Sequence, residues 1–169
     1  MNERKRSAIG VVEREYHFLE DRLDAAPDAA FDSAVFAGEG EAWRLRDLIA
    51  HLAYWQQLAT RAAERMARES VRPGPDERLR TFVGETRGID ELNAAAVTAA
   101  RGRTVAEVRD ELRRAHSRFV EAMREVPEDL LMTGDGPEEF VSVLLVPAVR
   151  HLRTHRDHID AALKEGAKT

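Results

Sequence analysis

Apolar residues recur at steps of three and four along most of the chain, and this spacing places them on one face of an α-helix. In the first segment these positions are Ile9, Val12, Tyr16, Leu19 and Leu23. The same spacing recurs in three more long segments. It predicts four amphipathic helices, over residues 3–26, 43–68, 104–126 and from 137 or 138 to about 164. A shorter pattern predicts one extra helix, over residues 89–100.

Proline and glycine residues mark the connections between these helices. Pro27 should end the first helix, and residues 27–42, which include Gly38 and Gly40, should form a loop. Residues 70–88 contain the run Pro73-Gly74-Pro75 and are too many for a tight helical hairpin. We therefore expect a long crossover there.

Two local sequence features predict where the later helices begin and where one of them is interrupted. Thr104 is followed three residues on by Glu107, which predicts a capping box at a helix N-terminus. Pro147 lacks a backbone N–H and crowds the carbonyl four residues back, so we expect a kink or a helix restart at 146–147. Four amphipathic helices bury their apolar faces against one another, which predicts an all-α fold, a four-helix bundle formed by a single domain over residues 1–169.

Three histidines near the C-terminus carry the candidate chemistry. His151, His155 and His158 are spaced i, i+4, i+7 in the stretch HLRTHRDHI, which keeps their rings within about 60° of arc on one helix face. The same face carries Leu144 and Ala148 and should point into the core, where an unpaired imidazole costs about 1–3 kcal/mol. Two neutral histidines at i, i+4 can bind one divalent cation, and a third ligand would then come from another helix.

His51 is the best candidate for that third ligand. It lies on the apolar face of the second long segment, three residues after Leu48 and four before Trp55. Taken alone, such a histidine is more often a hydrogen-bonded core residue than a ligand. Together with His151 and His155, it would form a three-histidine site with one or more open positions.

The two remaining histidines lie off the apolar stripes of their helices. His17 is one step from its stripe, and we interpret it as an exposed or boundary residue. His116 lies beside its own stripe, facing a cavity or solvent, and we interpret it as structural.

Composition excludes several classes of chemistry. The chain has no cysteine, so disulfides, thiolate nucleophiles and cysteine-ligated metals are impossible. The net charge is −5, with 26 basic and 31 acidic residues interspersed, which does not indicate binding to nucleic acid. The charged N-terminus is not followed by an apolar signal region, and nowhere do 18 apolar residues run together. We therefore expect a soluble, cytoplasmic protein without a membrane span.

Three segments carry a resemblance to a known family: WRLRDLIAHLAYW at 43–55, ELNAAAVTAARGRTVAEVRDELRRAHSRF at 91–119 and HLRTHRDHI at 151–159. In their order and separation the chain resembles the DinB/YfiT-like superfamily of metalloenzymes, and within it most closely the ClbS/DfsB family. The resemblance implies a four-helix bundle with up-up-down-down topology. It also implies a divalent metal, zinc, nickel or iron, held by His51, His151 and His155. His158 would lie beside these ligands, at a position where many relatives have glutamine.

The same resemblance implies a range of functions. The superfamily includes thiol-dependent transferases and isomerases, and the ClbS/DfsB branch includes a protein that disarms a genotoxin by opening a strained ring. Because DinB-like bundles often pair, the resemblance also implies a homodimer.

Three hypotheses follow for the histidines. The first is a metal-dependent enzyme, a hydrolase or transferase, that acts on a small electrophilic molecule by hydrolysis, ring opening or thiol transfer. The cation would lower the pKa of bound water toward ~7. In a variant without metal, a histidine serves as general base, and Tyr16, Tyr54 or Trp55 shapes the pocket. The second is a non-catalytic protein that sequesters a toxic small molecule. The third is a structural bundle whose histidines pair with acids such as Glu13, Glu20 or Asp157.

Overall fold

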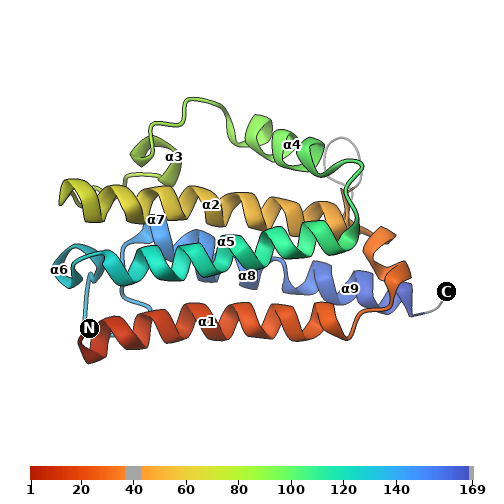
Figure 1. Ribbon diagram of the computed structural model, residues 1–169, viewed down its shortest axis with the longest axis horizontal. Coiled ribbons are helices and arrows are strands. Elements are labelled where there is room, and N and C mark those ends of the chain that lie inside the picture. The colour runs from red at the N-terminus through yellow and green to blue at the C-terminus, as the bar shows by residue number, and fades with distance from the viewer. Residues whose placement is uncertain (37–42, 168–169) are drawn as a thin grey trace.

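The computed structural model describes residues 1–36 and 43–167, and its helices lie along one long axis (Figure 1). The expected all-α four-helix bundle is confirmed. Three of its members are α1 (Glu3–Asp24), α2 (Leu45–Glu69) and α5 (Val105–Glu125). The fourth is an interrupted C-terminal run of α7 (Ser142–Leu145), the π-helical turn η2 (Val146–Arg150), α8 (His151–Thr154) and α9 (Arg156–Gly166).

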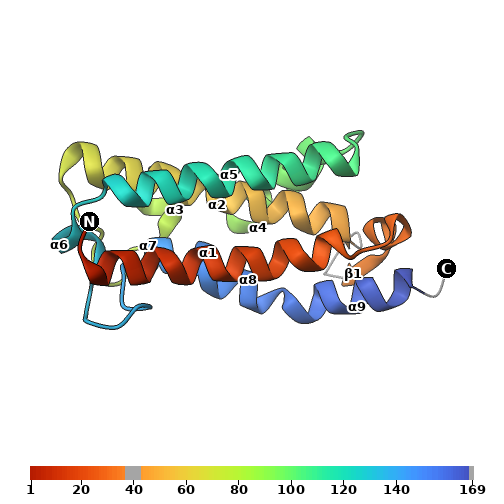
Figure 2. The ribbon, with the colours of Figure 1, turned by 60° about the horizontal axis from the view of Figure 1, so that its bottom comes forward.

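The order of directions in the bundle differs from the expected up-up-down-down. In both views α1 runs one way, α2 and α5 run the opposite way, and the C-terminal run follows α1, which makes the order up-down-down-up (Figures 1 and 2). The reason lies in the first connection, which turns back at one end of the bundle and so makes α1 and α2 antiparallel. The long crossover does exist, between α2 and α5, and contains α3 (Leu79–Phe82) and α4 (Ile89–Ala100).

The connection between α1 and α2 contains more regular structure than the sequence pattern predicts. A 3₁₀-helix η1 (Asp28–Asp32) follows Pro27, and the short strand β1 (Ala34–Phe36) pairs antiparallel with β2 (Trp43–Arg44). Because Trp43 and Arg44 are extended, α2 begins at Leu45 and not at residue 43. The expected turn at Gly38 and Gly40 lies outside the described residues.

Local capping explains where the helices begin and end. The capping box predicted at Thr104 is present, since the Thr104 side chain accepts from the backbone N–H of Glu107, and Glu107 accepts from the backbone N–H of Thr104. At the start of α2, Asp47 accepts from the backbone N–H of Arg44 at 2.9 Å. The helix ends at Glu69 and is capped by Ser70, whose φ of 51° is left-handed. A four-residue helix, α6 (Glu128–Leu131), follows α5 after Pro127.

The last helix is shorter and more broken than expected. It begins at Ser142, not near 137, and the interruption predicted at 146–147 appears as the π-helical turn η2. Pro147 contributes no N–H to this turn, and the backbone N–H of His151 bonds to the carbonyl of Val146, five residues back. A second break, which the periodicity did not predict, separates α8 from α9 at His155, where φ is −92° and ψ is 1°.

The core consists of two clusters that follow one another along the bundle. One packs the N-terminal half of α1 against the C-terminal halves of α2 and α5 and against α7 and η2. The other packs the remaining halves of these helices against η1 and α9. No helix within the described residues combines the length and the apolar character needed to cross a lipid bilayer.

Candidate metal centre

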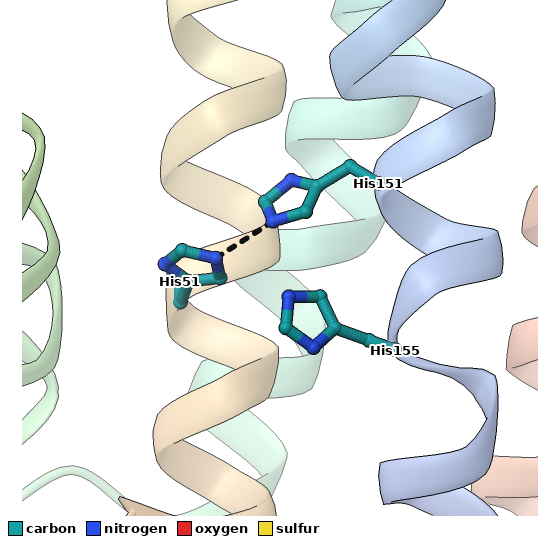
Figure 3. A group of neighbouring side chains, drawn as sticks. All are labelled: His51, His151 and His155. Atoms are coloured by element: carbon teal, nitrogen blue, oxygen red, sulfur yellow. Dashed lines mark hydrogen bonds between the residues drawn. The ribbon is translucent and has the colours of Figure 1, made fainter. Parts of the chain in front are cut away.

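His51, His151 and His155 converge inside the bundle, as the sequence predicted. Figure 3 shows the side chains of His151 and His155 pointing from the C-terminal run toward His51 on α2. The Nε2 atoms of His51 and His151 are 2.8 Å apart, and one ligand atom from each of the three rings lies within 4.8 Å of the others. The ring centroids are separated by 4.7 Å for His51–His151, 4.9 Å for His151–His155 and 5.5 Å for His51–His155.

The breaks in the C-terminal run lie directly beside His151 and His155. The π-helical turn η2 ends immediately before His151, and an inserted residue of this kind rotates the following side chains by about 100° relative to a regular helix. His155 lies at the junction of α8 and α9, where its backbone N–H still bonds to the carbonyl of His151 at 3.2 Å. Both irregularities therefore help to decide where the two imidazoles of this run point.

Burial keeps the three imidazoles neutral at physiological pH. It is the largest cause that lowers the pKa of His51 to about 2, followed by the repulsion that a proton on His51 would meet from protonated His151 and His155, while the Asn93 side chain opposes the change. Burial likewise lowers the pKa of His151 to about 3 and that of His155 to about 4, with smaller contributions from His155 and His158 respectively. A neutral imidazole has the free ring nitrogen that a metal ligand requires.

The residues present fit a divalent cation. Two imidazole nitrogens that share such an ion lie ~3 Å apart, given ligand bonds of about 2.0–2.1 Å, and the Nε2 atoms of His51 and His151 already have this spacing. Three imidazoles and no thiolate form a donor set that suits zinc, nickel or iron without selecting one of them. His51, His151 and His155 are therefore the residues that would hold the ion.

The centre opens into a cavity of about 1140 Å³ between the bundle and the crossover. The three histidines line one wall. The opposite wall comes from the crossover, with residues 75–80 before α4 and Asn93, Val97 and Arg101 from α4 and its end. Ile89 and Val146 also line the cavity, and these two apolar side chains are 44% and 46% exposed.

Both tryptophans of the chain flank the histidines. The Trp43 ring lies 5.0 Å from that of His51, and the Trp55 ring lies 6.1 Å from that of His151. Trp55, which we predicted as a pocket residue, does line the cavity, and its indole N–H donates to Oδ1 of Asn93 at 3.0 Å. Asn93 was missed by the sequence analysis, since a single amide beside Leu92 in a short helix gives only a weak signal.

The two tyrosines predicted in the pocket lie elsewhere, whereas His158 lies where it was expected. Tyr54 accepts a hydrogen bond from Arg87 at 3.3 Å, and Tyr16 donates to Glu20 at 2.7 Å; within the described residues neither tyrosine lines the cavity. His158 lies beside the centre, with its Nδ1 3.1 Å from Nδ1 of His155.

The remaining two histidines are separate from the three-histidine cluster. His17 is exposed, as expected. His116 is buried at 7% exposure, and its ring stacks on that of Tyr16 with 3.7 Å between centroids and 7° between planes. It therefore packs against an aromatic ring, not toward the cavity or solvent that the sequence suggested.

Comparison with known proteins identifies the domain type. The family model described as the mycothiol maleylpyruvate isomerase N-terminal domain matches residues 12–156, which includes all three histidines of the centre. No curated protein and no solved structure matches the chain.

Proposed function

Since the chain belongs to the mycothiol maleylpyruvate isomerase N-terminal domain family, a DinB-like family, we propose that it is a metal-dependent enzyme acting on a small electrophilic molecule. The observation that carries this proposal is the convergence of three neutral imidazoles, from two different helical runs, at the wall of a large cavity. When bound, a divalent cation at this point supplies Lewis acidity that polarises an electrophile or lowers the pKa of water toward ~7.

The remaining residues of the centre would bind and orient the substrate. Trp43 and Trp55 present flat apolar surfaces beside the histidines, and Val97, Val143 and Leu79 are further apolar residues of the cavity lining. Such a lining favours the body of an apolar molecule and excludes water from the reacting group. Hydrolysis, ring opening and thiol transfer all fit this arrangement, and the thiol named in the family's description makes thiol transfer the first reaction to test.

The lowered pKa values of His51, His151 and His155 favour a role as metal ligands over a role as general bases. A side chain with a pKa of about 2 to 4 is a poor proton acceptor near pH 7, where general bases work best with a pKa close to the operating pH. The same values leave the ring nitrogens free for a cation. The structure therefore supports the metal-dependent hypothesis better than the variant in which a histidine acts alone.

The test is metal content followed by turnover. Protein purified without a histidine tag should contain about one equivalent of Zn, Ni or Fe by elemental analysis, and His51→Ala should lose it. The exposed His17→Ala should retain it, which controls for removal of any histidine. A panel of epoxides, cyclopropanes and α,β-unsaturated ketones, with and without thiol, should then show turnover that is lost in His51→Ala. Protein that neither contains metal nor binds added Zn²⁺, Ni²⁺ or Fe²⁺ would overturn the proposal.

One observation favours a second candidate, a ClbS/DfsB-type protein that sequesters a toxic small molecule. The cavity of about 1140 Å³ exceeds the 300–1,000 Å³ typical of small-molecule sites, so it accommodates a bulky ligand. Binding would quench or shift the fluorescence of Trp43 and Trp55, which are the only tryptophans in the sequence. A ligand that alters this fluorescence at stoichiometric concentration and is recovered unchanged would favour sequestration over turnover.

A further inference from the structure

The side chain of His155 meets that of His158 on the side away from the other two histidines of the cluster. Figure 3 shows Nε2 of His155, the ring nitrogen farther from the backbone, turned toward His51 and His151, with Nδ1 on the opposite side of the ring. That Nδ1 lies 3.1 Å from Nδ1 of His158, a distance at which one ring donates a hydrogen bond to the other. His155 therefore faces the cluster with one ring nitrogen and His158 with the other.

The break between α8 and α9 places the two rings side by side. His155 is the N-cap of α9 and His158 is the third residue of that helix, and these are the two positions that pair in a capping box. The ring centroids lie 5.3 Å apart, with 46° between the ring planes. His155 is buried and His158 is half-buried, so the contact lies at the edge of the core. The local backbone of the α9 N-terminus thus brings His158 to the outer side of a candidate ligand.

Binding of a cation would fix the direction of this hydrogen bond. A neutral imidazole that binds through Nε2 carries its proton on Nδ1, so His155 would be the donor. Nδ1 of His158 must then accept, which places the proton of neutral His158 on its own Nε2. In the opposite arrangement His158 donates and His155 is protonated on Nε2, the atom that faces the other two rings, so His155 cannot bind. The tautomer of His158 therefore decides whether His155 can be a ligand.

We infer that His158 is a positioning residue for the metal centre: its Nδ1 accepts the Nδ1–H of His155, which leaves Nε2 of His155 free and aimed at the other two histidines. This inference rests on the proposed metal-binding function. A histidine that binds a metal generally needs an acceptor for its second ring N–H, because that hydrogen bond fixes both the tautomer and the orientation of the ring. Metal affinity would then depend on a half-buried residue that is not itself a ligand.

Two variants of His158 test the inference through Zn²⁺ affinity, measured by competition with a chromophoric chelator. His158→Phe keeps an aromatic ring and removes the acceptor, so affinity should fall by about 10–100-fold. In His158→Asn the amide oxygen can take the place of Nδ1 as acceptor, so affinity should return close to the wild-type value. His17→Phe makes the first substitution at an exposed histidine of α1 and should leave affinity unchanged. Unchanged affinity in His158→Phe, or an equal loss in both His158 variants, would overturn the inference.

A tautomer measurement on the wild-type protein decides the matter even if a variant fails to fold. Long-range ¹H–¹⁵N NMR spectra of the Zn²⁺-loaded protein, recorded well above the ordinary histidine pKa of about 6.5, should show His155 protonated on Nδ1 and His158 protonated on Nε2. A His155 bound through Nδ1, or a His158 protonated on Nδ1, would refute the role of His158 and leave the metal-binding function standing. Wild-type protein that binds no added Zn²⁺, Ni²⁺ or Fe²⁺ would instead refute the proposed function, and this inference with it.

Discussion

His116 allows the effect of burial on the stability contributed by a histidine to be measured away from the three-histidine cluster. The ring lies on α5 at 7% exposure and stacks on Tyr16. Burial is the largest cause that lowers its pKa to about 4, the charge of His17 lowers it further, and Glu20 opposes both. Because Nδ1 is buried and has no hydrogen-bond partner in the described part of the chain, the folded protein accommodates a proton there poorly.

The sign and size of the effect follow from the two pKa values. The folded pKa of about 4 lies below the ordinary value of 6.5, so between these values the unfolded state binds more protons than the folded state. The contribution of His116 to stability is therefore fully present above about pH 6.5 and is lost as the pH falls toward 4. At 1.36 kcal/mol per pKa unit, this interval corresponds to about 3 kcal/mol of unfolding free energy.

The variant His116→Phe isolates this contribution, since phenylalanine keeps an aromatic ring for stacking on Tyr16 and does not titrate. Urea unfolding of both proteins, followed by far-ultraviolet circular dichroism in EDTA at pH 7, 6, 5 and 4, should give curves that converge or cross at low pH. Between pH 7 and 4 the variant should lose about 3 kcal/mol less than wild type, because the other titrating groups are the same in both proteins. Equal losses in the two proteins would show that the ring is not protected from protonation in the folded state.

Three further substitutions have defined consequences for stability, measured by the same urea unfolding at pH 7. Phe119→Ala removes a fully buried ring and should cost about 3–5 kcal/mol. Gly166→Ala would place a Cβ 2.5 Å from Cα of Ala30, so α9 must shift away from η1, at a cost of about 1–3 kcal/mol; the control Gly88→Ala, with no atom within 4 Å, should cost less. Ser70→Gly should stabilise the protein by about 0.5–1 kcal/mol, because a left-handed φ of 51° strains serine and not glycine; a loss of stability would contradict this explanation.

The long helices were predictable because each of them keeps one apolar face along its whole length. The expected bounds 43–68 and 104–126 differ by only a residue or two from α2 and α5. The strand pair was not predictable, since β1 and β2 comprise only three and two residues and are too short to show an alternating pattern. They lie in the connection between α1 and α2, which as a whole turns the chain back and makes α2 antiparallel to α1 (Figures 1 and 2).

The C-terminal run shows where periodicity fails. Pro147 predicted an interruption of the helix. The sequence did not indicate that the backbone would continue through a π-helical turn or that the helix would break again at His155. A regular helix through residues 151–158 would have presented all three histidines in one column. In the structure only His151 and His155 join His51, while His158 lies against His155.

The three-histidine cluster and the cavity wall that faces it come from two parts of the chain, which differ in how regularly apolar residues recur. The three histidines lie on α2 and at the two ends of α8, within apolar faces that make inward histidines visible from spacing alone. The wall facing them comes from residues 75–101, where prolines, short helices and charged side chains follow no single period. Since the bundle helices hold the three histidines and the crossover forms the facing wall of the cavity, substitutions in the crossover can change the shape of the cavity while the histidines stay in place. Asn93 is where the two parts meet, because it belongs to α4 of the crossover and accepts a hydrogen bond from Trp55 of α2 at 3.0 Å.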